Sequence, residues 1–581
     1  MFARLICVLV AFGLATAGLT GCDRPKSTAP AEKLDEVANT NLPSPPRLGS
    51  GQGEVSNPPG DVSTIHWLGK KRLATDTNAA SVMAIWNLPE TARLGTQTLE
   101  KLALAPWRLL KNDAATNGAP VALLRPLLDD LVTEEWHLVI HHPTNQPAAW
   151  SLAIKLPAER FPLWQTNLAA VLESLTGAKA TQTSDGFNCP SSILHPPSSD
   201  FVFRLSRTND WIMLGFAPQY SKPETRNSEL GNGSLQSALR RPPPVPTNWL
   251  SLSLDPAALN RAFSFGWSLP ANCPRVDLAM TGSDQSVQTR GSLTFVQPPS
   301  IHLQAWNIPT NLVQEPLVGF TALRGVAHWL DLKTFDNSLP VPTLTQLFGW
   351  SVQGSPLQTY LAAPVPNASN LVAAISTYLI DRSRQYFSTN PLGHIEQTPR
   401  GGLQWVELPF LPASLEATNI TPGEFILAGW SPVLPRPRPI PDALLAQFIA
   451  STNLLYYDWE ITQPRVEGWI YLAQTFRWVG HLAQLPPNGH AQVWLKAIST
   501  NLQNCVTRAV LVDPSHVAIA RKSTIGFTAM ELQFLADWLE SPSYPSGLHS
   551  LEVEPDPRLY YIPKSKRATP ALSTNAPSIV R

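Results

Sequence analysis

Apolar residues recur along this chain with two periods, and the two alternate many times. Runs with apolar and polar positions in alternation predict strands with one buried face. They are WHLVI from Trp136, WSLAIKL from Trp150, FVFRL from Phe201, TYLAAPV from Thr359 and QWVELPF from Gln404. Helices are predicted for TQTLEKLAL from Thr96, PLWQTNLAAVLESL from Pro162, NLVAAISTYLI from Asn370 and PDALLAQFIA from Pro441. Because strand–helix–strand spacing is irregular, we expect an α+β fold with mainly antiparallel sheets.

The last part of the folded region shows two clear local signals. The run CVTRAVLVDPSHVAIA predicts a hairpin that turns at Asp513-Pro514-Ser515. Thr528-Ala529-Met530-Glu531 matches a capping box. It predicts a helix that begins there and carries an apolar stripe.

Three short motifs occur twice, in the same order. Trp86-Asn87-Leu88-Pro89 returns as Trp306-Asn307-Ile308-Pro309, WIMLGFAP from Trp211 as FILAGWSP from Phe425, and TNWLSLSLD from Thr247 as TNLLYYDWE from Thr452. Each lies in a run that we interpret as a strand. A period of roughly 210 residues is far longer than a solenoid unit. We therefore expect two duplicated lobes, each a mainly antiparallel sheet with packed helices.

The third motif predicts which strand faces are buried. Leu250, Leu252 and Leu254 alternate with polar residues in the first copy, and Leu455, Tyr457 and Trp459 do so in the second. Both sets are expected to be buried within their own lobes. The opposite faces are predicted to be free, and they differ between the copies.

The first residues resemble the precursor of a bacterial lipoprotein. Arg4 precedes a short apolar run, and Leu19-Thr20-Gly21-Cys22 matches the lipobox. The resemblance implies cleavage before Cys22 and acylation of its thiol, which would anchor the protein in a membrane. Asp23 resembles a retention signal for the periplasmic face of the inner membrane. An ordinary signal peptide with a chance cysteine is the alternative.

Composition changes the picture in two ways. The chain has 43 basic and 43 acidic residues, so it lacks the basic excess that nucleic acid binding requires. Its 57 prolines predict many short elements bounded by turns. The expected divisions are a signal peptide over 1–21, a disordered tether over 22–60, lobe 1 over 61–300, lobe 2 over 301–555 and a disordered tail over 556–581. The body resembles uncharacterised envelope lipoproteins of similar composition.

Three cysteines remain besides Cys7 of the signal peptide and Cys22. In an oxidising compartment the pair Cys189 and Cys273 is the predicted disulfide, since both lie in the first lobe. Three reduced, buried cysteines are an equal alternative. No CxxC motif suggests zinc or redox chemistry.

Sequence motifs for common chemistry are missing. The chain has no P-loop, GxGxxG, GxSxG, HExxH or EF-hand motif, so we expect no nucleotide, no metal and no cofactor. His137 and His141 lie on one face of a strand about 13 Å apart, too far to share one zinc ion. The 19 tryptophans are interpreted mainly as packing residues, with a sugar or lipid groove as the alternative.

Tyr456, Asp458 and Glu460 form the candidate ligand-binding face, with no catalytic residue assigned. They lie on the strand face expected to be free. The sequence thus predicts a lipid-anchored protein of the cell envelope that acts as a non-catalytic binding or scaffold module for an unknown ligand or envelope protein. The alternative is an envelope hydrolase acting on glycan or ester, with Asp458 and Glu460 as its carboxylates.

Overall fold

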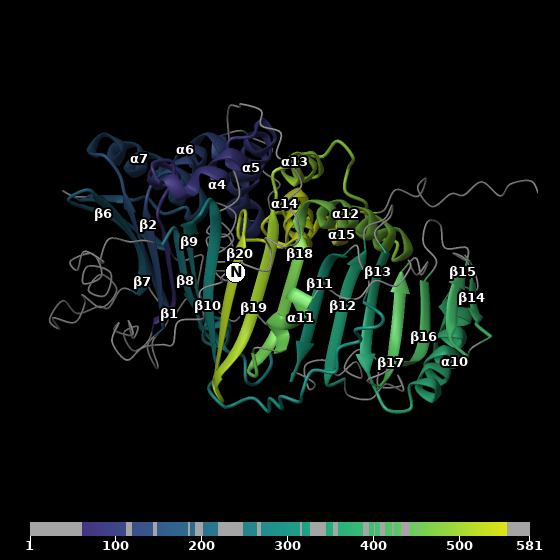
Figure 1. Cartoon of the computed structure of the whole chain (residues 1–581). Helices are drawn as coiled ribbons and strands as arrows, with labels where there is room; N and C mark the ends of the chain where they lie inside the picture. The colour runs from purple at the N-terminus through teal and green to yellow at the C-terminus, as the bar shows by residue number, and fades with distance from the viewer. Residues whose placement is uncertain are drawn as a thin grey trace, which may run out of the picture.

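One antiparallel sheet runs through the whole folded body (Figure 1). The computed structural model describes residues 61–111, 119–142, 148–183, 186–191, 201–218, 248–263, 269–313, 317–325, 344–352, 358–386, 394–399, 401–406, 413–420, 423–430, 442–449 and 451–554. Cys22, the proposed signal peptide, the tether and the proposed tail therefore lie outside the described residues. Within that part of the chain every strand pairing is antiparallel, which confirms the α+β class.

The first half of the sheet contains β1 to β10. These strands are β1 (Asp61–Trp67), β2 (Trp136–His141), β3 (Ala149–Lys155), β4 (Thr181–Thr183), β5 (Gly186–Ser191), β6 (Phe201–Thr208), β7 (Trp211–Pro218), β8 (Leu250–Leu254), β9 (Arg275–Ser283) and β10 (Ser286–Thr294). Their order across the sheet is 4-5-6-7-3-2-1-8-9-10.

The second half contains β11 to β20. These strands are β11 (Leu317–Arg324), β12 (Gln346–Val352), β13 (Gln358–Pro364), β14 (His394–Gln397), β15 (Leu403–Val406), β16 (Ala413–Ile420), β17 (Gly423–Trp430), β18 (Leu454–Ile461), β19 (Asn504–Asp513) and β20 (His516–Ser523). Their order is 14-15-16-17-13-12-11-18-19-20, which is the order of the first half with ten added to each number. β10 pairs with β20 and joins the halves.

Two local irregularities occur at corresponding places in the halves. The pairing of β1 with β2 shifts register between Asp61 and Ser63, and that of β11 with β12 shifts between Leu317 and Gly319. At the first residue of β5, a Cβ on Gly186 would lie 1.8 Å from the carbonyl oxygen of Leu205. At Gly402, just before β15, the corresponding distance to the carbonyl oxygen of Leu415 is 2.6 Å. Only glycine permits this close approach of two strands.

Most helices cover one side of the sheet, which we call the helical face. The α-helices are α3 (Lys70–Leu73), α4 (Ala80–Trp86), α5 (Pro89–Lys111), α6 (Ala119–Thr133), α7 (Phe161–Thr176), α9 (Pro256–Phe263), α10 (Ala368–Tyr386), α11 (Asp442–Ile449), α12 (Thr462–Val479), α13 (His490–Ser499), α14 (Ala529–Glu540) and α15 (His549–Glu552). α11 packs instead on the opposite face, where Leu444 belongs to the same apolar cluster as Phe348 and Tyr457.

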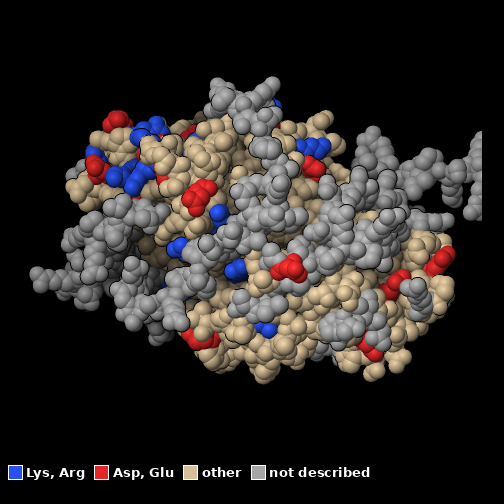
Figure 2. Space-filling model, viewed as in Figure 1, with Lys and Arg blue, Asp and Glu red and all other residues tan. Residues whose placement is uncertain are grey.

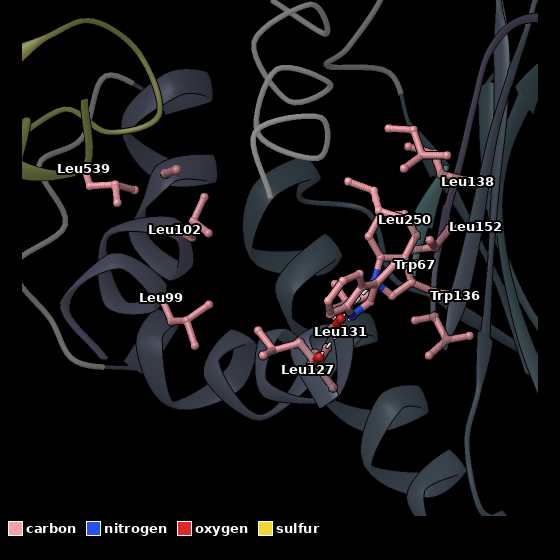
Figure 3. Packing of buried hydrophobic residues seen from close by; sticks show 14 of the residues in the cluster. Trp67, Leu99, Leu102, Leu127, Leu131, Trp136, Leu138, Leu152, Leu250 and Leu539 are labelled. Atoms are coloured by element: carbon pink, nitrogen blue, oxygen red, sulfur yellow. Dashed lines mark hydrogen bonds between the residues drawn. The ribbon is translucent and has the colours of Figure 1, made fainter. Parts of the chain in front are cut away.

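The main core lies between the first half of the sheet and its helices (Figure 3). Trp67 and Trp136 are 1% and 2% exposed, and their indole N–H groups donate to the carbonyl oxygens of Val132 and Leu131 at 3.1 and 2.8 Å. Leu99 on α5 and Leu539 on α14 belong to the same core. Burial of these indoles with satisfied N–H groups confirms the packing role expected for tryptophan at these positions.

The local predictions from the sequence were largely confirmed. The five strand runs fall in β2, β3, β6, β13 and β15, and the four helical runs in α5, α7, α10 and α11. Residues 407–410 of the last strand run, and Pro441 and Ala450 of the last helical run, lie outside the described residues. The hairpin at 513–515 joins β19 to β20. Thr528 and Glu531 form the capping box that begins α14, with both reciprocal hydrogen bonds present.

The first repeated motif was wrongly interpreted. Trp86 ends helix α4, after β1, whereas Trp306 lies in the irregular connection before β11. These places do not correspond, and neither is a strand. The other two motifs lie on β7 and β17 and on β8 and β18, which occupy the same positions in the two strand orders.

The predicted disulfide is also corrected. Cys189 and Cys273 are free thiols. Cys189 is on β5 and Cys273 just precedes β9, and seven inter-strand steps separate these strands. At about 4.8 Å a step the distance along the sheet is roughly 30 Å, whereas a disulfide needs sulfurs about 2 Å apart.

Candidate functional site

An apolar cavity of about 630 Å³ lies against the helical face of the second half. Its floor is formed by β11 to β18, and its walls by α10, α12 and α14. Apolar side chains dominate the lining, among them Leu347, Leu361, Leu403, Leu415, Trp405 and Trp469. Its volume lies in the range of about 300–1,000 Å³ that is typical of small-molecule sites.

The row of residues that forms the floor of the cavity has smaller side chains than the row at the same places in the first half. The register shifts in β1 and β11 give the two halves a common reference point, and they match Ile65 with Thr321. From each of these residues, direct cross-strand pairs continue as one row across seven strands. In the first half the row is Leu252, Ile65, Leu138, Leu152, Leu214, Leu205 and Phe187. In the second it is Asp458, Thr321, Gly349, Leu361, Ala428, Leu415 and Leu403.

Three differences between the two rows account for most of the difference in side-chain volume. Thr321, Gly349 and Ala428 stand where the first half has Ile65, Leu138 and Leu214. In the neighbouring row Trp150 is replaced by Thr359. Because protein interiors are packed to crystal density, this loss of volume leaves space unless helices move inward to fill it.

The mouth of the cavity is bordered by exposed apolar side chains. Leu361, Phe476 and Met530 line the cavity and are 48%, 46% and 42% exposed. Phe534, one turn beyond Met530 on α14, is 60% exposed. Contiguous exposed apolar residues at the edge of a cavity are a common feature of ligand entrances and interaction surfaces.

One end of the cavity carries a buried arginine. Arg465 on α12 lines the cavity and donates to the hydroxyl of Ser351. Its Nε lies 3.9 Å from Oε2 of Glu460 and has no hydrogen-bond partner among the described residues. Its guanidinium also lies 5.3 Å from the ring centre of Trp469. Gly319 permits this position, because a Cβ there would lie 3.2 Å from Nε.

Two acidic residues of β18 lie next to Arg465 beneath the helices. Oδ1 of Asp458 accepts from the Thr321 hydroxyl at 2.6 Å, and Oε1 of Glu460 accepts from the backbone N–H of Ala529 at 2.7 Å. Glu460 therefore binds the first turn of α14, where a negative charge is stabilised by the helix dipole.

Burial determines the protonation of both carboxyl groups. It raises the pKa of Asp458, and it raises the pKa of Glu460 to about 7, with a further contribution from the charge of Asp458. Hydrogen bonding and the charge of Arg465 act in the other direction. Farther along the sheet, Arg521 pairs with Glu531 at 2.7 and 2.8 Å.

The three residues of the predicted binding face were expected to be exposed to solvent, but two of them are buried. Only Tyr456 lines the cavity, whereas Asp458 and Glu460 are 9% and 3% exposed and lie under α12 and α14. The face is therefore not a free, solvated strand face. The apolar residues Leu455, Tyr457 and Trp459 are buried, as predicted.

The alignment of the two copies is shifted by one residue. The pairing registers place Leu252 at the position of Asp458, not of Tyr457. A register shift between Leu454 and Tyr456 accompanies this difference. The two copies thus turn opposite sets of side chains toward the helices, which no alignment of the motifs alone could indicate.

No pattern in the sequence pointed to the residues that line the cavity. Gly349 and Ala428 are small residues within apolar strands, and Arg465 is a single basic residue after Pro464. A comparison of the two copies strand by strand would have revealed the loss of bulk. It requires the strand order, which the sequence does not provide.

Charge is sparse and mixed on the surface. Figure 2 shows one face on which basic and acidic residues are interspersed, with no large patch of a single sign in its coloured part. In the described part of the chain, no helix combines the length and apolar character needed to cross a membrane.

Comparisons with known proteins add little. No family model and no curated protein matches the chain. Among solved structures, the chain is similar to one described as the structure of crystal form III of TP0453, with 10% identity over 40% of this chain and 76% of that chain. The TM-score is 0.21, so the similarity supports no conclusion about fold or function.

Proposed function

We propose that this chain is a lipid-anchored protein of the cell envelope whose body is a non-catalytic binding module for an apolar ligand. The observation that carries the proposal is the apolar cavity of about 630 Å³ with its exposed apolar mouth. We take the ligand to be an acyl chain. Each methylene transferred from water into such a site contributes about 0.8 kcal/mol.

The lipobox supports the proposed location. Acylation at Cys22 would hold the body at a membrane, and a tether of about 40 residues would let it move on the order of 35 Å from the surface. Asp23 favours the periplasmic face of the inner membrane. A membrane within this reach is also a source of acyl chains for the cavity.

The arrangement of the acidic residues favours binding over hydrolysis. A hydrolase of glycan or ester would need Asp458 and Glu460 to reach a substrate, but neither lines the cavity. Both are instead held by partners within the fold, Thr321 and the N-terminus of α14. The carboxylates thus have a structural explanation.

We also infer that the two halves arose by duplication. Identical strand order, the corresponding register shifts and the glycines at the start of β5 and before β15 support this origin. Superposing β1–β10 on β11–β20 should give a rotation close to 180°, because the equivalent strands β10 and β20 pair antiparallel. A good fit only with a different strand assignment would contradict the inference.

Two experiments test the function. Full-length protein purified from its native membrane should release an acyl compound on solvent extraction, identified by mass spectrometry. The neutral fluorophore N-phenyl-1-naphthylamine should bind with a stoichiometry of one and be displaced by methyl laurate. Absence of both signals would contradict the binding function.

The anchor is tested separately. Cys22→Ser should abolish incorporation of labelled fatty acid and release the protein into the soluble fraction. Binding of the fluorophore should be unchanged in this variant, since none of the residues that line the cavity is altered. A variant that is still labelled and remains in membranes would contradict the proposed anchor.

A further inference from the structure

Two histidines of the first half are cross-strand neighbours. His66 on β1 pairs directly with His137 on β2. Their rings are stacked, with centres 4.2 Å apart and planes at 15°. Both project from the side of the sheet opposite to the helical face, since Trp67 and Trp136, one position away, are buried under the helices. The two residues are 71 positions apart in the sequence, so strand pairing alone brings them together.

Glu135, the residue before β2, completes the group. Its Oε1 lies 3.2 Å from Nε2 of His66 and 4.0 Å from Nε2 of His137. One ligand atom from each of the three residues lies within 4.8 Å of the others. Such an arrangement of two imidazole nitrogens and one carboxylate oxygen is a frequent ligand set for zinc.

A neighbouring arginine orients the carboxylate. Arg72 donates to Oε2 of Glu135 at 2.7 Å, which leaves Oε1 directed at the two imidazoles. Hydrogen bonds of this kind from outside the ligand set fix the geometry of metal-binding carboxylates. The side chains of His66, Glu135 and His137 are 11%, 7% and 23% exposed, so the group is enclosed but open to solvent at His137.

We propose that His66, Glu135 and His137 bind one divalent transition-metal ion, with zinc as the ion that the ligand set fits best. This site is independent of the cavity. Zinc lies about 2.0–2.2 Å from such ligands, so two ligand atoms on one tetrahedral ion are about 3.4 Å apart. The 3.2 Å between Glu135 and His66 fits this spacing, and the 4.0 Å between Glu135 and His137 must shorten when the ion binds. The two ring planes must tilt from their stacked arrangement so that both nitrogens point to one ion.

Three protein ligands leave one position of a tetrahedral zinc ion for water. The positive charge of Arg72 opposes a cation and limits the affinity.

The second half provides an internal comparison. The positions of His66 and His137 are occupied there by Ala322 and Phe348, which are also directly paired and both fully buried. The fold therefore accepts apolar residues at this pair of positions. The sheet therefore forms without polar residues at these positions. We explain the two histidines by metal binding and not by a structural hydrogen-bond network.

The test is a zinc titration of the full chain after removal of metal with a chelator. Isothermal calorimetry should give one zinc ion per chain, with no binding of Mg²⁺ or Ca²⁺, which prefer sites made of oxygen ligands alone. His137→Gln and His66→Gln should each weaken zinc binding at least tenfold.

His141→Gln is the matched control. His141 lies on the same strand and pairs with Asp61 at 2.9 Å, outside the proposed site, so its substitution should leave zinc affinity unchanged. Circular dichroism verifies folding of each variant, and the partly exposed His137 provides the variant least liable to unfold. No zinc binding, or binding that survives both His66→Gln and His137→Gln, would overturn the proposal.

Discussion

The two halves of this protein share one strand order, but their hydrophobic cores lie on opposite faces of the sheet. In the first half the helical face is packed with large side chains such as Leu138 and Leu152, which are 2% and 3% exposed. In the second half the equivalent positions hold Gly349 and Leu361, and Leu361 is 48% exposed at the mouth of a cavity. Its dense core lies on the opposite face, around Phe348, Trp350 and Tyr360.

The same face of the sheet is filled in one half and hollow in the other because the two halves differ in the chain available to cover it. The connection between β1 and β2 covers residues 68–135 and supplies α3 to α6, which pack over the first half. The corresponding connection between β11 and β12 spans residues 325–345, of which 326–343 lie outside the described residues. It has too few residues to supply all four of these helices, so less chain is available to cover the small side chains on this side of the second half.

The largest effect on ligand binding is expected when large residues of the first half are introduced at the same places in the second half. Thr359→Trp combined with Ala428→Leu places the bulk of Trp150 and Leu214 into the cavity. Binding of N-phenyl-1-naphthylamine should fall at least tenfold, measured by fluorescence titration.

Thr500→Trp is the control, since it adds the same ring at an exposed position at the end of α13. It should not change binding. Unchanged binding in the double variant, with its fold intact, would show that the cavity is not the site.

A matched pair of truncations measures the difference in packing. Leu152 and Leu361 occupy equivalent positions, but only the first is buried. Leu152→Ala should reduce the free energy of unfolding by about 2–5 kcal/mol, and Leu361→Ala by less than about 1 kcal/mol. Chemical denaturation of both variants provides the values. Equal losses would mean that the second half is packed as densely as the first.

Acidic residues replace leucines on β18, and their effect depends on pH. The pKa of Glu460 is raised to about 7, whereas an unfolded chain has a glutamate pKa near 4.3. Between these values the folded state binds the extra proton, so stability falls as pH rises from about 4.5 to 7. Glu460→Gln should remove this fall, and its stability relative to the wild type should increase over that range.

The measurement is the unfolding free energy at pH 5 and pH 8, with an expected difference on the order of 2 kcal/mol between wild type and variant. Glu159→Gln is the control, because Glu159 is exposed and should show no such change. A wild type that becomes more stable from pH 5 to pH 8 relative to Glu460→Gln would contradict the raised pKa.

Local structure was well predicted where the signal was contained in a few consecutive residues. Thr528 and Glu531 form their capping box because both hydrogen bonds close within one turn. WHLVI and WSLAIKL became neighbouring strands because their alternation fits a pleated sheet. The match between Trp86 and Trp306 was misleading, because a similarity of four residues does not specify a position in a fold.

The candidate site could be predicted only in part. Sequence analysis selected Tyr456, Asp458 and Glu460 by their alternation, and Tyr456 does line the cavity. The two carboxylates were expected to be exposed to solvent. The contact between Glu460 and the backbone N–H of Ala529, the first residue of α14, joins segments 69 residues apart and leaves no local pattern in the sequence. Arg465 was not selected, since one arginine in a helix carries no signal until its neighbours in space are known.

By itself, the sequence determined the class of the fold, most of its strands and helices and the burial of Leu455, Tyr457 and Trp459. These depend on periodicity and on short-range hydrogen bonds, which act within a few residues. The tertiary structure decided which face of each half is filled, where the cavity lies and that His66 meets His137. Those features depend on pairing between distant strands and on a one-residue shift of register, because a shift of one residue moves every side chain to the other face.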